Sequence, residues 1–299
     1  MPNNDKPIGV FDSGLGGLTV ARAISHALPH ESITYVGDTK RCPYGPRDQA
    51  EVRLFVRQVG AWLERRDVKF VVVACNTATA AGLDVLQRAL DVPVIGVIEP
   101  GARAAVQATR TRRVGVLATQ GSVDSGAYPS AIHMLDAGVG VTQQAAPVFV
   151  DIVERKLTSG ECLHKEWMRD RGVFDAPDVR LAVEQGVAPL MNRGIDTVVL
   201  GCTHFPLLSR QIRAALGDGV RIVSSAEETC RELAETLERR GDLASADNEP
   251  TYRFASTSDD ITSFAVAGSF IFGHDLDSIE HIDVEDLEAL ADERDMEGN

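Results

Sequence analysis

The sequence predicts an α/β protein with two similar open parallel-sheet domains. They are related by approximate two-fold pseudo-symmetry, with a site in the cleft between them. Two observations carry this prediction. Short β-branched runs alternate with longer amphipathic stretches, which is typical of parallel sheets covered by helices. The segments that hold these runs also resemble one another in the two halves of the chain. The 299 residues suffice for two domains of ordinary size.

Seven β-branched runs are expected to form strands. They are, in chain order, Pro7–Phe11, Ile33–Val36, Phe70–Ala74, Val92–Val97, Arg113–Leu117, Thr197–Gly201 and Val220–Val223. Helices are expected between them, and the clearest is Gln49–Arg66, in which apolar residues recur at helical spacing. The YRFASTSD segment that begins at Tyr252 is expected to add one more strand.

Three pairs of segments indicate an internal duplication. Ile8–Gly17 resembles Val114–Val123, Val92–Gly101 resembles Val220–Thr229, and VVVACNTAT, which ends at Thr79, resembles TVVLGCTHFP, which ends at Pro206. Each half would then contain a first strand, a strand that ends at a cysteine, and a following strand. We expect residues 1–98 and 209–272 to form the first domain, residues 99–208 the second, and residues 273–299 an acidic C-terminal tail.

Charge and composition exclude several classes of protein. The net charge of −14 argues against a nucleic-acid-binding protein, which would need a basic surface. Residues 274–299 contain eleven Asp or Glu and one Arg, so we expect this tail to be solvated and partly helical or disordered. The five cysteines form no CxxC pair, and their odd number argues against a disulfide scaffold.

The N-terminus lacks a basic region followed by an apolar run, and no stretch reaches the roughly 18 apolar residues of a spanning helix. We therefore expect a cytoplasmic protein with reduced thiols that binds neither membranes nor nucleic acids.

Cys75 and Cys202 each follow a β-branched run, at the point where a parallel strand is expected to end. Ligands of open parallel sheets bind beyond the carboxyl ends of the strands, so a cleft between the domains would bring the two thiols together. Two opposed thiols suit the removal of a proton from one face of a carbon and its return to the other face. Each cysteine taken alone could equally be a buried structural residue, and the matched pair favours the functional interpretation.

Polar residues accompany both cysteines. Asn76 and Thr77 follow Cys75 and can donate hydrogen bonds to a carboxylate, while a helix that starts here would lower the pKa of the thiol. His204 follows Cys202 and could act as an acid or base or tune the thiol. A zinc site formed by Cys75, Cys202 and His204 is an alternative, but it lacks local ligand spacing. A cysteine hydrolase using Cys202 and His204 is another, and it leaves Cys75 unexplained.

The FDSGLGGLTV segment places Asp12 and Ser13 after a strand, before a glycine-rich turn and a helix. Asp12 could hold a substrate ammonium or assist a cysteine, and N–H groups at the helix start suit a carboxylate. A dinucleotide site is disfavoured because Thr19 stands where the third glycine of GxGxxG is required.

Three further segments are less specific. Tyr44 and Gly45 lie in a basic loop and could offer a phenol and a backbone N–H to an anion, although such loops are more often simply solvated. Cys42 shares this loop without an evident activating partner. Thr119 and Glu154 follow predicted strands or begin helices and, on sequence alone, are ordinary polar residues.

Together these motifs resemble the glutamate racemase family, within the cofactor-independent aspartate/glutamate racemase superfamily. The resemblance extends to about residue 272 and rests on FDSGLGGLTV, the PYG loop, VVACNTAT, VPVIGVIEPG, FVDIVE, LGCTHFPLL and SSAEET. The basic Lys40-Arg41-Cys42 segment, an apparently long stretch from Glu161 to Val179 and the acidic tail depart from the family pattern.

The resemblance implies interconversion of L- and D-glutamate without pyridoxal phosphate, another cofactor or a metal. It implies that Cys75 takes the α-proton from the D-enantiomer and Cys202 takes it from the L-enantiomer, assisted by Asp12, Glu154 and His204. The implied substrate-binding residues are Asp12, Ser13, Tyr44, Gly45, Asn76, Thr77, Thr119, Thr203 and His204. It further implies a homodimer and a role in peptidoglycan synthesis. An aspartate racemase and a regulatory protein whose tail docks a basic partner are the alternatives.

Overall fold

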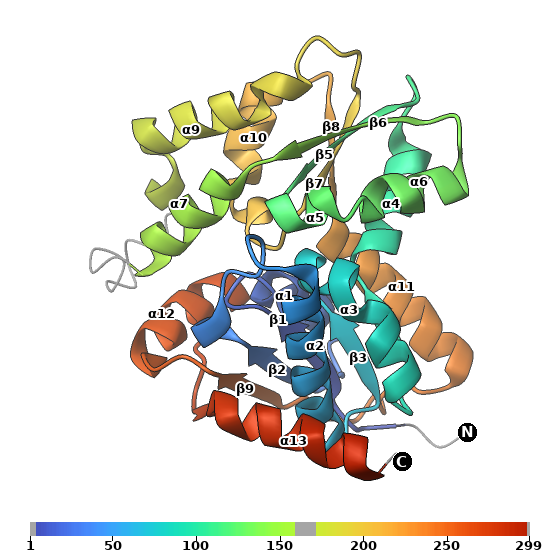
Figure 1. The fold of residues 1–299 in the computed structure, drawn as a ribbon, viewed down its shortest axis with the longest axis vertical. Coiled ribbons are helices and arrows are strands. Elements are labelled where there is room, and N and C mark those ends of the chain that lie inside the picture. The colour runs from blue at the N-terminus through green and yellow to red at the C-terminus, as the bar shows by residue number, and fades with distance from the viewer. Residues whose placement is uncertain (1–3, 159–171, 298–299) are drawn as a thin grey trace.

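A computed structural model describes residues 4–158 and 172–297 and shows two parallel sheets, one in each of two stacked domains (Figure 1). The first sheet has the strand order β10-β9-β2-β1-β3-β4. These strands are β1 (Ile8–Asp12), β2 (Ile33–Gly37), β3 (Phe70–Val73), β4 (Val94–Gly96), β9 (Tyr252–Ser256) and β10 (Ile279–His281). The second sheet has the order β6-β5-β7-β8, formed by β5 (Arg113–Ala118), β6 (Gly140–Ala145), β7 (Thr197–Gly201) and β8 (Arg221–Ser224).

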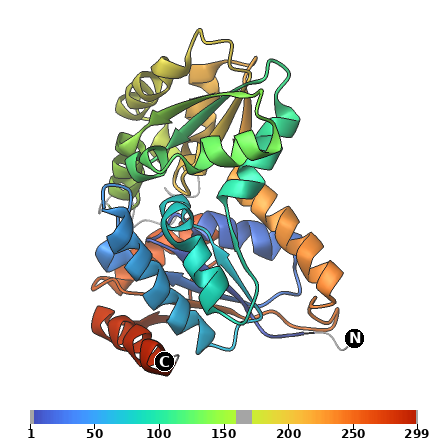
Figure 2. The ribbon, with the colours of Figure 1, turned by 45° about the vertical axis from the view of Figure 1, so that its right-hand side comes forward.

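Helices cover both sheets. Those of the first domain are α1 (Leu18–Ala27), α2 (Gln49–Glu64), α3 (Asn76–Ala89), α12 (Ile261–Phe272) and α13 (Val284–Glu297). Those of the second domain are α4 (Ile98–Ala108), α5 (Gln120–Asp124), α6 (Ala127–Leu135), α7 (Pro147–Thr158), α9 (Pro177–Val187) and α10 (Ser209–Leu216). The long helix α11 (Ser225–Arg240) packs against both α1 and α4 and so joins the domains (Figure 2). Short 3₁₀ turns are η1 (Thr39–Arg41), η3 (Gly172–Phe174), η4 (Ala188–Leu190) and η5 (Phe205–Leu208).

Local sequence explains the main elements. All residues of β1 and β3 are buried, as expected for parallel strands covered on both faces. Helix α2 begins where the Asp48 side chain accepts a hydrogen bond from Ala50 N at 2.8 Å. It buries the apolar stripe that contains Val52, Phe55 and Val59. The predicted helix Gln49–Arg66 is therefore confirmed, with its end at Glu64.

The two sheets share one topology, which confirms the predicted duplication. In each, the first four strands of that sheet in chain order are arranged second, first, third, fourth: β2-β1-β3-β4 and β6-β5-β7-β8. The equivalent strands are β1 and β5, the cysteine strands β3 and β7, and the following strands β4 and β8. Strands β9 and β10 extend the first sheet at the edge next to β2.

The predicted domain boundary at residue 209 is wrong. Strand β8 was expected in the first domain, but it pairs in parallel with β7, and α10 packs on α9 of the second domain. The duplication accounts for this, because β8 is the equivalent of β4 and each belongs beside the cysteine strand of its own sheet. The chain returns to the first domain only with α11 and β9.

The expectation that residues 273–299 form a separate, solvated tail is also wrong, although the segment is partly helical, as expected. Strand β10 pairs with β9, and α13 packs against α2. Ile282 and Leu287 are 4% and 0% exposed, and Glu280 forms an ion pair with Arg66. The segment therefore completes the first domain. Its apolar residues recur among so many carboxylates that composition alone conceals the buried face.

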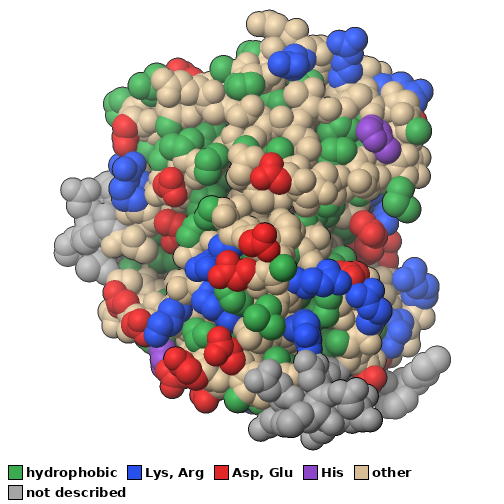
Figure 3. Space-filling view, in the orientation of Figure 1, with side chains coloured by type: hydrophobic (Ala, Val, Ile, Leu, Met, Phe, Trp, Pro, Cys, Tyr) green, Lys and Arg blue, Asp and Glu red, His purple; other side chains and the backbone are tan. Residues whose placement is uncertain are grey.

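Charge is mixed over the face of the molecule seen in Figure 3, where acidic and basic side chains of the first domain are interspersed. Within the residues that the structure describes, no helix is long and apolar enough to cross a membrane.

Candidate active site

The two cysteines at the ends of equivalent strands face one cavity between the domains. Cys75 follows β3 and caps α3, where its Sγ accepts a hydrogen bond from Ala78 N at 3.5 Å. Cys202 directly follows β7. Each is 6% exposed, and both line a cavity of about 20 Å³. This volume holds about one water molecule, so the domains are closed on each other here.

All the predicted site residues except Asp12 and Glu154 line this cavity, and both of these bond to residues that do. The lining residues are Ser13, Cys42, Pro43, Tyr44, Gly45, Cys75, Asn76, Thr77, Thr119, Val150, Cys202, Thr203 and His204.

Cys202, His204 and Glu154 form a chain of interacting side chains. Its Sγ lies 3.7 Å from Nδ1 of His204, whose Nε2 lies 2.6 Å from Oε1 of Glu154. Burial alone would lower the pKa of His204, but hydrogen bonds and charge at Cys202 and Glu154 together raise it well above its ordinary value. The ring is thus held as an imidazolium, which stabilises negative charge on the Cys202 sulfur.

Cys75 lies in different surroundings. Burial raises the pKa of its thiol to about 12, the nearby Asp12 carboxylate adds to this effect, and Ala78 N–H and the Ser13 hydroxyl oppose it. Its Sγ lies 3.6 Å from Ser13 Oγ. The helix N-terminus was expected to lower the pKa of Cys75, but desolvation outweighs it. These surroundings therefore favour the neutral thiol at Cys75.

Asp12 interacts with residues near both cysteines. Its carboxylate accepts hydrogen bonds from Gly14 N at 3.1 Å and from Thr203 Oγ1 at 3.3 Å. Burial raises the pKa of Asp12, while the charge of His204 and these hydrogen bonds oppose the shift. One carboxylate is thus within electrostatic reach of both Cys75 and His204.

Hydroxyl groups of the two domains meet at another wall of the cavity. Thr77 Oγ1 of α3 lies 2.9 Å from Thr119 Oγ1, and Thr119 also caps α5 through Ser122 N at 3.3 Å. Gly121 N donates to Gly45 O at 2.8 Å, which closes the same side of the cleft. These contacts join residues from both domains around the space where a substrate must lie.

The Tyr44 hydroxyl was expected to be available to an anionic ligand, but it is already used in a hydrogen bond within the protein. Its hydroxyl donates to the buried carboxylate of Asp38, which also accepts hydrogen bonds from Arg41 Nε at 2.7 Å and Thr257 Oγ1 at 3.0 Å. Tyr44 therefore anchors the loop, and its neighbour Gly45 makes the contact with the second domain.

Sequence reasoning missed some lining residues. Val150 lies one helical turn before Glu154 on α7, so the FVDIVE segment contained a signal for it. Cys42 is a third thiol at the cavity, and burial, followed by the charges of Glu154 and Asp12, raises its pKa well above the ordinary value. Cys162 lies outside the described residues, as does much of the stretch between Glu161 and Val179.

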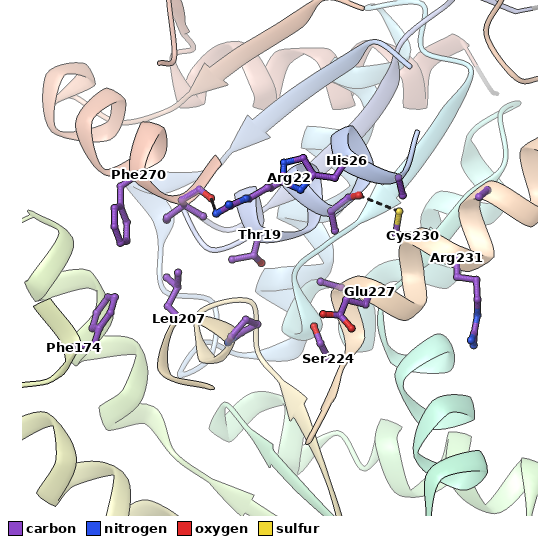
Figure 4. A pocket seen from close by; sticks show the side chains of 16 residues that line it. Thr19, Arg22, His26, Phe174, Leu207, Ser224, Glu227, Cys230, Arg231 and Phe270 are labelled. Carbon is purple, nitrogen blue, oxygen red and sulfur yellow. Dashed lines mark hydrogen bonds between the residues drawn. The ribbon is translucent and has the colours of Figure 1, made fainter. Parts of the chain in front are cut away.

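A much larger cavity lies elsewhere and contains neither catalytic candidate. Its volume is about 840 Å³, and it lies between α1, α11, α12 and η5 (Figure 4). Arg22, His26 and Glu227 lie at this cavity together with apolar residues such as Phe270. The paired thiols, rather than cavity size, therefore locate the candidate active site.

Comparison with known proteins agrees with this geometry. The profile of the Asp/Glu/Hydantoin racemase family matches residues 16–233. A glutamate racemase from Lysinibacillus sphaericus is 46% identical over 251 residues, which are 84% of this chain and 89% of that protein.

Two solved structures are similar over almost their whole length. Glutamate racemase isoform RacE1 from Bacillus anthracis has a TM-score of 0.85 and 42% identity, covering 94% of this chain and 99% of that one. The glutamate racemase from Francisella tularensis, solved with D-glutamate, has a TM-score of 0.82 and 29% identity, covering 95% and 99%. The chain therefore belongs to the Asp/Glu/Hydantoin racemase family, is similar to its glutamate racemases, and is an isomerase.

Proposed function

We propose that this chain interconverts L- and D-glutamate by a two-base proton transfer between Cys75 and Cys202. The observation that carries the proposal is the placement of these thiols at the ends of equivalent strands, β3 and β7, on one closed cavity. The D-glutamate bound by the Francisella tularensis relative supports the choice of substrate.

The proposed mechanism starts with Cys75 protonated, because burial and Asp12 raise the pKa of its thiol. His204, whose pKa is raised well above its ordinary value, lies beside Cys202 and favours negative charge on that sulfur in the proposed cycle. One thiol is thus ready to accept a proton and the other to donate one. Because the two thiols share one proton through the cycle, they titrate as a coupled pair.

In this state the enzyme is prepared for L-glutamate. The Cys202 thiolate takes the α-proton, the electron pair stays on the substrate as a carbanion, and Cys75 gives its proton to the opposite face. D-glutamate leaves with Cys75 as the thiolate and Cys202 as the thiol. Proton exchange with solvent, in which Cys75 gains a proton and Cys202 loses one, then restores the starting state, while D-glutamate reacts with the other state by the reverse steps. Asp12 does not line the cavity but bonds to Thr203, which does, so its charge can stabilise a substrate ammonium; hydroxyls of Thr77 and Thr119 can stabilise charge on a carboxylate.

Substrate entry requires the domains to separate, because the cavity of about 20 Å³ is smaller than glutamate. Closure then excludes water and sets the geometry of transfer. No cofactor or metal takes part in the proposed steps. We further propose that the product D-glutamate serves peptidoglycan synthesis, that the chain acts in the cytoplasm, and that it forms a homodimer, which sedimentation velocity tests.

The deciding experiment follows the α-proton. Purified chain without added cofactor should racemise either enantiomer of glutamate in ²H₂O and place solvent deuterium at Cα. Cys75→Ala and Cys202→Ala should each slow turnover by about 10²–10⁴-fold, the usual contribution of an acid–base group. Cys230→Ala, in the buried part of α11 outside the active-site cavity, is the matched control.

Full-rate racemisation by either single variant would exclude the two-base scheme. Turnover of aspartate in preference to glutamate, measured side by side, would overturn the proposed substrate. A trapped acyl-enzyme and full activity of Cys75→Ala would instead indicate a cysteine hydrolase.

A further inference from the structure

The side-chain amide of Asn76 is unusual among the cavity residues. Asn76 is the first residue of α3, directly after Cys75, and is 2% exposed. Its Nδ2 atom is buried and, among the residues that the structure describes, has no hydrogen-bond partner. A buried donor without a partner is destabilising, so such a group at an active site points to a ligand that accepts its hydrogen bond.

The other end of the amide is held by a residue of the opposite domain. Tyr128, near the start of α6 and 0% exposed, donates a hydrogen bond from its hydroxyl to Asn76 Oδ1 at 2.7 Å. Its ring packs against the β7 end, where a Cβ on Gly201 would lie 2.9 Å from Tyr128 Cε2. The small residue at that position allows the ring to lie so close, and the close packing limits its movement.

The direction of this hydrogen bond determines how the amide is turned. Burial raises the pKa of the Tyr128 hydroxyl well above its ordinary value, so the hydroxyl keeps its proton. A hydroxyl that donates to Oδ1 occupies that end of the planar amide and leaves Nδ2, which has no partner, as the available donor of a residue that lines the cavity.

We propose that Tyr128 is a positioning residue that turns the Asn76 amide so that its NH₂ group donates to a carboxylate oxygen of the substrate. This inference rests on the proposed function, which supplies glutamate as the anionic ligand. Because Tyr128 and Asn76 belong to different domains, the amide is aligned only when the domains are closed. The hydrogen bond thus couples closure to substrate binding.

The test combines a double-mutant cycle with an isosteric replacement. Tyr128→Phe should weaken D-glutamate binding and raise KM in both directions about three- to tenfold, the usual range for one lost hydrogen bond. In an Asn76→Ala background the same change should have no further effect, because Tyr128 acts through the amide. Binding is measured by calorimetry, separately from turnover, and thermal unfolding shows that each variant is folded.

Asn76→Asp tests the direction of the amide. It keeps an acceptor for Tyr128 and replaces the NH₂ group with a second oxygen, so it should weaken D-glutamate binding more than Asn76→Ala does. Tyr252→Phe, on β9 with its ring packed against Phe272, is the matched control and should leave binding unchanged.

Equal effects of Tyr128→Phe in the native and Asn76→Ala backgrounds would overturn the proposal, as would tighter binding by Asn76→Asp. A native chain that binds D-glutamate without racemising it would contradict the proposed function alone, and the binding cycle would still decide the role of Tyr128. A native chain that does not bind glutamate would overturn both.

Discussion

The Nε2 atom of His204 lies 2.6 Å from Oε1 of Glu154, while Nδ1 of the same ring lies 3.7 Å from the Cys202 sulfur. Cys75 has Ser13 and the capping N–H of Ala78 as its partners instead. The two thiols therefore occupy equivalent positions on duplicated strands but differ in their electrostatic surroundings. Because of this asymmetry, we expect the two thiols to differ in reactivity and in their response to pH.

Glu154→Gln removes a charge that raises the pKa of His204. In the native chain His204 keeps its proton to a higher pH, so the loss of that charge should move the basic limb of the L-to-D kcat/KM profile to lower pH. The measurement is kcat/KM against pH for each enantiomer, with Glu184→Gln on the exposed face of α9 as the control. Profiles that coincide for Glu154→Gln and the native chain would contradict the role of this pair.

The same pair makes stability depend on pH. A raised pKa in the folded state contributes stability that is fully present below the unfolded value of about 6.5 and is lost as pH rises through the folded value. The free energy of unfolding of the native chain should therefore exceed that of Glu154→Gln most near pH 6, and the difference should shrink at alkaline pH. Urea unfolding at a series of pH values measures it. A difference that grows as pH rises would show that the sign is wrong.

Alkylation should distinguish the two thiols directly. The thiolate is the nucleophile, and burial keeps Cys75 protonated with a pKa of about 12. Cys202 lies next to an imidazolium. Iodoacetamide at pH 7.5 should therefore modify Cys202 faster than Cys75, and the ratio of rates should fall as pH rises. Peptide mapping by mass spectrometry measures both rates, with Cys230 as an internal reference. Equal rates at pH 7.5 would contradict the difference in electrostatic surroundings between the two thiols.

Gly121→Ala should hinder closure of the domains. A Cβ on Gly121 would lie 2.7 Å from the carbonyl oxygen of Gly45, and a backbone atom cannot yield as the end of a flexible side chain can. We expect kcat/KM to fall about tenfold or more with little change in Tm, because the clash lies between domains rather than in a core. Gly219→Ala, where an added Cβ meets no atom within 4 Å, is the control. Full activity of Gly121→Ala would show that domain closure does not depend on the close contact between Gly121 and Gly45.

The sequence predicted the parts of the site that depend on strand ends. Cys75 and Cys202 follow strongly β-branched runs, and the carboxyl ends of parallel strands face ligands whatever the details of the loops. The hydrogen bond from Tyr128 to Asn76 could not be predicted in this way, because it depends on how two separate domains pack. The hydrogen bond from the Tyr44 hydroxyl to Asp38 also depends on tertiary packing, so the sequence did not indicate that this phenol is already occupied.

The missed elements have weak local patterns. Strand β6, with the sequence GVTQQA, has no continuous apolar run and is only partly buried, since it lies at a sheet edge. Strand β8 resembles β4 in sequence and also in position, because each lies beside the cysteine strand of its own sheet.

The acidic C-terminal segment provides the last prediction. Leu287 of α13 is 0% exposed and belongs to the core under α2, the helix that follows the Tyr44 loop. Leu287→Ala should lower the free energy of unfolding by about 2–5 kcal/mol, the range for a buried leucine, and deletion of residues 274–299 should destabilise the first domain further. Thermal and urea unfolding measure both, with Leu181→Ala, 56% exposed on α9, as the control. A truncated chain with unchanged Tm and racemase activity would mean that the segment is a removable appendage, whose carboxylates are then free to serve a partner. Loss of stability in both variants would instead mean that the acidic surface is the solvent face of a structural helix.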